Sequence, residues 1–111
     1  MMTLIVKNRE IATDKEGFLT DLNDWSETVA EALAEAEGLT LTEQHWEVLK
    51  LLRQFQQEFD ISPPMRPLVK YVTLHLGADK GKSIYLTRLF PPNPAKIASK
   101  IAGLPKPEGC I

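Results

Sequence analysis

The sequence predicts a mainly helical α+β fold, with a short N-terminal β-hairpin, a bundle of helices and a flexible C-terminal arm. Three observations support this prediction. Two short β-favouring runs open the chain, five segments with helix-like patterns follow, and residues 103–111 contain two prolines and two glycines. Since no repeat or long linker divides these segments, we expect one domain over residues 1–111, with residues 103–111 as a mobile arm.

The composition is that of an ordinary soluble protein. The 111 residues are 43% hydrophobic and 25% charged, with a net charge of −2. The apolar run Met1–Val6 is too short for a signal peptide or a membrane span, so we expect a cytoplasmic protein without a membrane partner. A single cysteine, Cys110, cannot form an internal disulfide, which agrees with a reducing compartment.

Charge is divided unevenly along the chain. Residues 1–61 hold 5 Lys/Arg and 13 Asp/Glu, whereas residues 62–111 hold 8 Lys/Arg and 2 Asp/Glu. A division of this kind indicates an anionic partner, or an anionic group, near the basic half. The alternative is that the charges only cover solvated helix faces.

The first two runs, residues 3–6 and 9–13, are expected to pair as a hairpin. Lys7 and Asn8 lie between them, and asparagine tolerates the positive φ that a tight hairpin turn needs. Two strands alone are marginal in water, so the hairpin should pack on helices. Phe18, which follows a predicted turn, should enter the core together with its neighbour Leu19.

Two helices are expected in the acidic half. Asp24 and Glu27 have the spacing of a capping box before a helix that reaches about Ala36, and Gly38 should end it. Thr42 should cap a longer helix that runs to about residue 59. The residues expected to face inward are Trp25, Val29, Leu33 and Ala36 in the first helix, and Val48, Leu49, Leu52, Phe55 and Phe59 in the second.

Three further helices are expected in the basic half. The proline-containing turn 60–64 precedes a helix over residues 65–76, and the two helices that it joins resemble a helix-turn-helix pair. Ser83 should cap a short helix. Asn93, followed by Pro94 at the first helical position, should begin the last helix, which leads directly into the arm.

The residues do not favour a metal, nucleotide or other cofactor site. His45, His75 and Cys110 are far apart in the sequence and show no paired ligand spacing. Both histidines are expected at the surface or at the boundary of the core. The segment 77–83 ends in Gly-Lys-Ser, but it is one residue shorter than a phosphate-binding loop.

Nucleic-acid binding is a competing hypothesis. The second helix of the predicted pair carries Arg66, Lys70, Tyr71 and His75, which are able to contact phosphates or base edges. The preceding helix is acidic and the net charge is negative, and both features oppose strong binding to phosphates. In this hypothesis the protein is a regulatory or binding module, and Cys110 acts as a redox sensor.

Cys110 is the main candidate for chemistry. A nine-residue arm reaches roughly 30 Å when extended, at about 3.3 Å per residue, so its thiol can enter another protein's active site. Positive charge favours the thiolate, and Lys106, Lys100 and Arg88 are the candidates to supply it. A thiolate is able to take the outer sulfur of a persulfide, by the geometry of thiol–disulfide exchange. The alternative is an incidental cysteine in a frayed terminus.

Several motifs along the chain resemble those of a known family. They are Glu43-Gln-His-Trp-Glu47, Ser62-Pro-Pro-Met-Arg66 with Leu68-Val69-Lys70, Lys80-Gly81 through Tyr85-Leu86, Leu89-Phe90-Pro91, and Pro94-Ala-Lys96 through to Gly109-Cys110-Ile111. The last motif is long and places the cysteine at the penultimate position. On these motifs the sequence resembles the TusE/DsrC family of sulfur relay proteins over nearly its whole length, which implies a DsrC-like fold.

The resemblance also favours one branch of the family. Members tied to dissimilatory sulfite reductase have a second cysteine eleven positions before the penultimate one, where this chain has Ser99. The TusE branch, which lacks that cysteine, implies a sulfurtransferase that carries a persulfide on Cys110 for the 2-thiolation of the wobble uridine of tRNA. A DsrC-like accessory of sulfite reductase is the alternative.

The TusE-type resemblance implies specific partners. The sulfur donor would be the TusD-like subunit of a TusBCD-type complex, and the acceptor would be an MnmA-type thiouridylase bound to tRNA. The candidates for supporting the thiolate or binding a partner are Lys106, Lys100, Arg88, Arg66 and Lys70.

Overall fold

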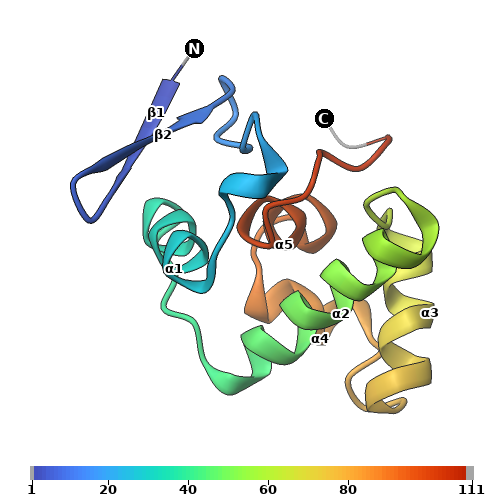
Figure 1. Ribbon diagram of the computed structural model, residues 1–111. Coiled ribbons are helices and arrows are strands. Elements are labelled where there is room, and N and C mark those ends of the chain that lie inside the picture. The colour runs from blue at the N-terminus through green and yellow to red at the C-terminus, as the bar shows by residue number, and fades with distance from the viewer. Residues whose placement is uncertain (1, 110–111) are drawn as a thin grey trace.

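Helices dominate the computed structural model, which describes residues 2–109 (Figure 1). The predicted mainly helical α+β fold with an N-terminal hairpin is confirmed. The elements in chain order are β1 (Met2–Val6), β2 (Arg9–Thr13), the 3-10 helix η1 (Leu22–Asp24), α1 (Glu27–Ala36), α2 (Glu43–Phe59), α3 (Met65–Leu76), α4 (Ser83–Leu89) and α5 (Pro94–Ile101).

The hairpin forms as predicted. Strands β1 and β2 pair antiparallel with Val6 opposite Arg9, and the two residues between them, Lys7 and Asn8, have φ values of 47° and 66°. Positive φ at both central positions gives the turn a twist that matches the flanking strands. One face of the hairpin, with Val6 and Ile11, is buried and packs beside α1.

Helix α1 begins later than the sequence predicted. Its N-cap is Ser26, whose hydroxyl accepts the Val29 N–H, so the prediction of Asp24 as the cap is wrong. Trp25 has extended backbone, which separates Asp24 in η1 from the helix. Ala36, which was expected to face inward, is exposed.

The end of α1 agrees with the prediction. Gly38 has a φ of 75°, its N–H donates to Glu35 O, and Leu39 N–H donates to Ala34 O. This pair of hydrogen bonds satisfies two of the last carbonyls of the helix.

Helix α2 begins at the predicted cap, Thr42. The prediction that His45 lies at the surface or at the boundary of the core is wrong. His45 is buried: its Nδ1 accepts the Thr42 N–H at 3.1 Å, and its Nε2 lies 2.8 Å from Leu89 O. The ring therefore donates from Nε2 and links α2 to the end of α4. Phe59, expected to face inward, is half exposed at the end of the helix, where its ring meets those of Phe55 and Tyr71.

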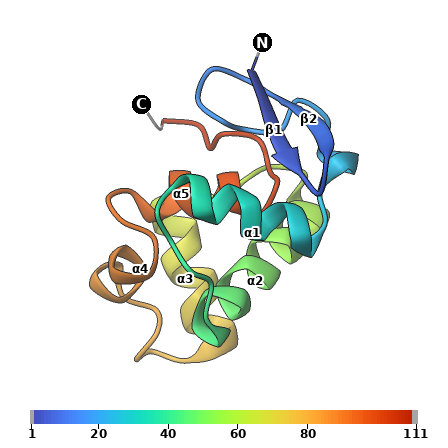
Figure 2. The same ribbon diagram turned by 90° about the vertical axis from the view of Figure 1, so that its left-hand side faces the viewer.

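Helix α5 is central to the core. It packs against α1, α2, α3 and α4, and the two views of the ribbon place it among them (Figures 1 and 2). Its start is as predicted: the Asn93 side chain accepts the Lys96 N–H, and Pro94 is the first helical residue. Ile97, Ala98 and Ile101 of this helix are all buried. The segment that follows α5 therefore begins in the middle of the helical bundle.

The α3–α4 connection folds back on α3. The Cα of Gly81 lies so close to Thr73 that a Cβ at this glycine would meet the Thr73 side chain. The N-cap of α4 is Lys82 and not Ser83, which is the first residue of the helix. Among the described residues, no helix is both long enough and apolar enough to cross a membrane.

Candidate functional site

The segment after α5 contacts the body as far as Pro107. Gly103 N–H donates to Lys100 O, and Leu104 N–H donates to Ser99 O at 2.9 Å. Leu104 is only 2% exposed, and Pro107 is also buried. Gly103, Leu104 and Pro107 are therefore buried against the core, and the mobility predicted for residues 103–111 stays a prediction.

Trp25 and Arg53 hold the point where the tail leaves α5. The Trp25 Nε1–H donates to Ile101 O at 2.9 Å, and the Arg53 Nη1–H donates to Ala102 O at 2.7 Å. The guanidinium also lies 3.8 Å from the centre of the Trp25 ring, a cation–π contact. Burial lowers the pKa of Arg53 from its ordinary value, although an arginine stays charged at neutral pH. These contacts fix the direction of the tail.

The backbone at Gly103 depends on this arrangement. Its φ is 74°, and a Cβ at this position would lie 2.3 Å from Cδ1 of Trp25. A glycine is required here for two independent reasons, the left-handed backbone and the close approach of the indole.

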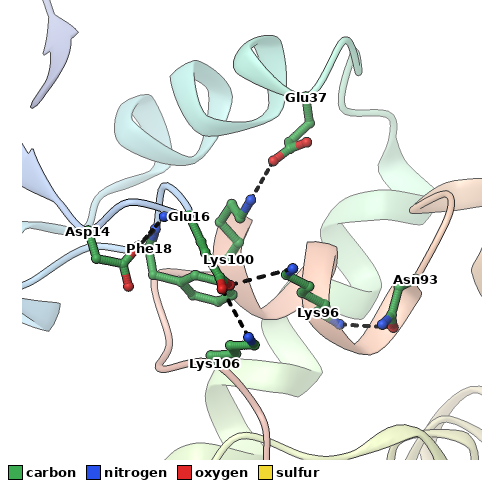
Figure 3. Close-up of polar contacts among 8 residues, drawn as sticks. All are labelled: Asp14, Glu16, Phe18, Glu37, Asn93, Lys96, Lys100 and Lys106. Carbon is green, nitrogen blue, oxygen red and sulfur yellow. Dashed lines mark hydrogen bonds and ion pairs between the residues drawn. The ribbon is translucent and has the colours of Figure 1, made fainter. Parts of the chain in front are cut away.

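Two further contacts hold the tail beyond Leu104. The Ser62 hydroxyl, in the turn between α2 and α3, donates to Pro105 O. Lys106 Nζ donates to Glu16 Oε1 at 3.0 Å, and Glu16 Oε2 lies 3.4 Å from Lys96 Nζ, so one carboxylate bridges the tail and α5 (Figure 3). The tail thus contacts the loop after the hairpin on one side and the α2–α3 turn on the other.

The loop that carries Glu16 is itself ordered by hydrogen bonds. The carboxylate of Asp14 accepts the N–H groups of Glu16 and Phe18 at 2.9 Å and 3.0 Å (Figure 3). The hydrogen bond from Lys106 is the main cause that lowers the pKa of Glu16, with a further contribution from Lys96. The loop is therefore joined to the tail by an ion pair, which is lost when the Glu16 carboxylate is protonated at low pH.

Lys100 is the second candidate cation that is already paired. Its Nζ lies 2.6 Å from Glu37 Oε1 and 5.3 Å from the centre of the Phe18 ring, and the residue is buried (Figure 3). Because the carboxylate takes up its charge inside the body, Lys100 joins α5 to the end of α1.

The ion pairs explain much of the uneven charge distribution. Each one joins a basic residue of the second half to an acidic residue of the first half, and the pairs are Lys80–Glu47, Lys96–Glu16, Lys100–Glu37 and Lys106–Glu16. The two oppositely charged halves therefore meet in the folded chain. An anionic group near the basic half was predicted, and part of it is supplied by the protein itself.

The described part of the tail, which stops at Gly109, lies beside the start of α3. Glu108 and Gly109 are exposed and line a hollow of about 490 Å³, whose other wall includes Arg66, Pro67 and Asn93. Cys110 is bonded to Gly109 and lies outside the described residues, so its predicted role stays a prediction. The hollow is the part of the described surface that lies next to Cys110 in the sequence.

The five candidate cations have two kinds of environment in the structure. Lys106 and Lys100 are engaged with glutamates, whereas Arg66, Lys70 and Arg88 are exposed. Only Arg66 among the five lines the hollow at the end of the tail.

Titration of Glu16 tests the tie between the tail and the loop. Since Lys106 lowers the folded-state pKa below 4.5, the ion pair stabilises the fold above that value and is lost as the pH falls through the lowered pKa. We expect the Glu16 carboxyl, followed by NMR, to titrate below 4.5 in the native chain and closer to 4.5 in Lys106→Met. An unchanged midpoint in that variant would show that Lys106 does not hold Glu16.

Comparisons with known proteins agree with this architecture. The family model described as DsrC like protein matches residues 5–111. The sulfurtransferase TusE of Photorhabdus laumondii is 51% identical over 111 residues, which cover 100% of both chains. The sulfurtransferase TusE of Yersinia pseudotuberculosis is 56% identical over 105 residues, which cover 95% of this chain and 97% of the relative.

Solved structures show the same fold. The NMR structure of Allochromatium vinosum DsrC has a TM-score of 0.88 at 47% identity, and the match covers 98% of this chain and 97% of that one. The crystal structure of the oxidized gamma-subunit of the dissimilatory sulfite reductase (DsrC) from Archaeoglobus fulgidus has a TM-score of 0.84 at 40% identity, covering 99% and 100%. With a family model that spans almost all of its residues and relatives that match it from end to end, the chain belongs to the DsrC-like family.

Proposed function

We propose that this sulfurtransferase carries sulfur as a persulfide on Cys110. The relatives named sulfurtransferase TusE match the chain over nearly their whole length, and they support a role in a sulfur relay. The single observation that carries the proposal is the course of the tail. It is held on the body as far as Pro107 and then becomes exposed at Glu108 and Gly109, directly before the only cysteine in the sequence.

The proposed chemistry needs one thiolate. The Cys110 thiolate attacks the outer sulfur of a donor persulfide, so that a new S–S bond forms on Cys110 and the donor's S–S bond breaks. The electron pair of the broken bond leaves on the inner sulfur of the donor, which departs as a thiolate. In the second step an acceptor thiolate attacks the outer sulfur on Cys110 in the same way, and Cys110 returns to its starting state.

The partners in this proposal follow from the TusE-type relatives and the family resemblance. We propose the TusD-like subunit of a TusBCD-type complex as the donor and an MnmA-type thiouridylase with bound tRNA as the acceptor. The product of the relay is then 2-thiouridine at the wobble position. The relay would operate in the cytoplasm, where a lone thiol stays reduced.

The packed tail limits how far the thiol reaches. From Pro107 to Cys110 there are three residues, so the reach is roughly 10 Å at about 3.3 Å per residue. While residues 103–107 stay on the core, a partner has to bring its own sulfur close to the hollow beside Arg66. We propose that sulfur is transferred at that hollow and not in a distant active site.

The proposal assigns different roles to the five candidate cations. Lys106 and Lys100 hold the tail and α5 through their glutamates, so their charge is shared with those carboxylates. We propose that Arg66, which lines the hollow, favours the thiolate by its charge. Lys70 and Arg88 are left as candidates for partner binding.

Deletion of residues 109–111 tests the proposal against the nucleic-acid alternative. The tail contacts described above end before Gly109, so we expect the shortened chain to keep its melting temperature and to lose tRNA 2-thiolation in complemented cells. The measurements are thermal unfolding and the 2-thiouridine content of tRNA. A helix-turn-helix regulator would instead show salt-sensitive duplex binding that survives the deletion, and retained thiolation would contradict the proposal.

A further inference from the structure

Half of the cations in the basic half of the chain have no acidic partner within the fold. Of the eight Lys and Arg residues after residue 61, four form the ion pairs described above. Within residues 2–109, no carboxylate pairs with the other four, and all of them are exposed. They are Arg66, Lys70, Lys82 and Arg88. The unpaired cations of the basic half therefore lie on α3, on α4 and in the loop between them.

Three exposed residues of α3 form one stripe. Arg66, Lys70 and Leu74 follow one another at intervals of four, which places them on the same side of the helix over a length of about 12 Å. Leu68 and Val72 lie on the opposite, buried side. We call this stripe the α3 face.

The loop after α3 extends the stripe. Thr73 is exposed and packs against Gly81, and Lys82 is the next residue. A third unneutralised cation therefore follows Gly81 near the end of the α3 face that Leu74 occupies.

The α3 face also exposes apolar surface. Leu74 is 77% exposed, and Ile84, at the start of α4, is 61% exposed. Aliphatic side chains beside cations are typical of protein interfaces, where an apolar centre has a polar rim. Recognition of single-stranded RNA depends instead on exposed rings for stacking. On α3, Tyr71 is buried against Phe55, and the exposed His75 packs its ring against Tyr71, about 180° round the helix from Arg66. The composition of the face favours a protein partner.

The position of the α3 face connects it to the reactive end of the tail. Its first residue, Arg66, lines the hollow that Gly109 also lines. Because Cys110 follows Gly109 in the sequence, a partner that exchanges sulfur with it approaches this end of the tail. A protein that binds to the α3 face therefore extends to this hollow.

We propose that the α3 face is the docking surface for a protein partner of the relay, and that this partner presents acidic residues around an apolar pocket that accepts Leu74. The inference rests on the proposed function. Charge complementarity supports this inference. Among the described residues, no carboxylate forms an ion pair with Arg66, Lys70 or Lys82, whereas each paired lysine of the same half has a glutamate partner. Opposite charge on the partner would steer the encounter and raise the association rate.

The test compares two variants with the same type of charge change. The docking variant is Lys70→Glu with Leu74→Ser, both exposed, and the control is Lys7→Glu in the hairpin turn, which the ribbon shows far from α3 (Figure 1). Intact mass follows sulfur gain from inorganic polysulfide, sulfur gain from a persulfidated TusBCD-type complex, and sulfur loss to an MnmA-type enzyme with tRNA.

We expect the docking variant to gain sulfur from polysulfide at the native rate, because its thiol is unchanged. At least one of the two protein-dependent steps should slow by about tenfold or more near 0.15 M salt, with a smaller difference near 1 M salt, where the Debye length is about 3 Å. The Lys7→Glu control should match the native chain in every step.

Other outcomes would overturn the inference. Protein-dependent rates within twofold of native in the docking variant would show that the α3 face does not dock a partner. A loss confined to binding of tRNA alone, or to self-association seen by sedimentation, would assign the face to RNA or to a second copy of the chain. If the native chain gained no sulfur from any donor, the proposed function itself would fail, which is a separate result.

Discussion

Replacement of Cys110 by serine is expected to abolish tRNA 2-thiolation while leaving the fold intact. A serine hydroxyl does not form a persulfide, and the sequence contains no second cysteine to take over the sulfur. The residue follows the exposed Gly109, beyond the part of the tail that is packed on the core. We therefore expect a melting temperature within about one degree of the native value and 2-thiouridine at the level of cells that lack the protein.

Gly109→Ala is a useful control for this variant. It leaves the thiol in place and changes only the backbone next to it, since a Cβ at Gly109 would meet nothing within 4 Å. Its φ of 80° makes alanine unfavourable there, so a modest loss of thiolation is expected, far smaller than that of Cys110→Ser. Full thiolation by the serine variant would remove Cys110 from the reaction.

Gly103→Ala is expected to have the largest effect on stability. Alanine at a φ of 74° costs about 1 to 2 kcal/mol in backbone energy, and the forced displacement of Trp25 adds about 1 to 3 kcal/mol. The displaced indole would also lose its hydrogen bond to Ile101 O and its contact with Arg53. A total loss of about 3 kcal/mol is a large fraction of the stability of a small domain.

Gly38→Ala separates the two causes. Gly38 has nearly the same φ, 75°, but a Cβ there would meet nothing within 4 Å, so only the backbone cost of about 1 to 2 kcal/mol applies. Urea unfolding of both variants gives the difference directly. Equal losses of unfolding free energy in the two variants would show that the packing of Trp25 on Gly103 contributes nothing.

The elements with strong local signals were predictable from the sequence. The hairpin turn at Lys7-Asn8, the glycine that ends α1 and the Asn93-Pro94 start of α5 all depend on the backbone preferences of single residues, and all are confirmed. Such signals act over a few residues, so no knowledge of distant contacts is needed.

The predictions that were wrong depend on distant contacts. Asp24 has the spacing of a cap, but Trp25 is drawn out of the helix toward Ile101, 76 residues away, and Ser26 takes the role. His45 was expected at the surface or at the boundary of the core, but it is buried, and Leu89 O accepts its ring N–H. Neither partner is visible in a local pattern.

The tail shows the same limit. Its prolines and glycines indicate an arm. No local pattern in residues 103–107 predicts that Leu104 is part of the core. The contacts of the segment with Ser62, Arg53 and Glu16 are not predictable from that pattern either. Of these holding residues, only Ser62 lies in a motif that the sequence singled out. The role of Cys110 stays a prediction from its residue type and from the family resemblance, whereas the contacts of residues 103–107 with the core required the structure.

The most direct test of the account is the intact mass of the reduced protein after it is mixed with a cysteine desulfurase and its sulfur-relay proteins. We expect one added sulfur atom on the native chain, removable by a thiol reductant and absent from Cys110→Ser. The same mass gain on the serine variant, or no gain on the native chain beside a donor shown to carry a persulfide, would contradict the proposal that Cys110 is the sulfur carrier.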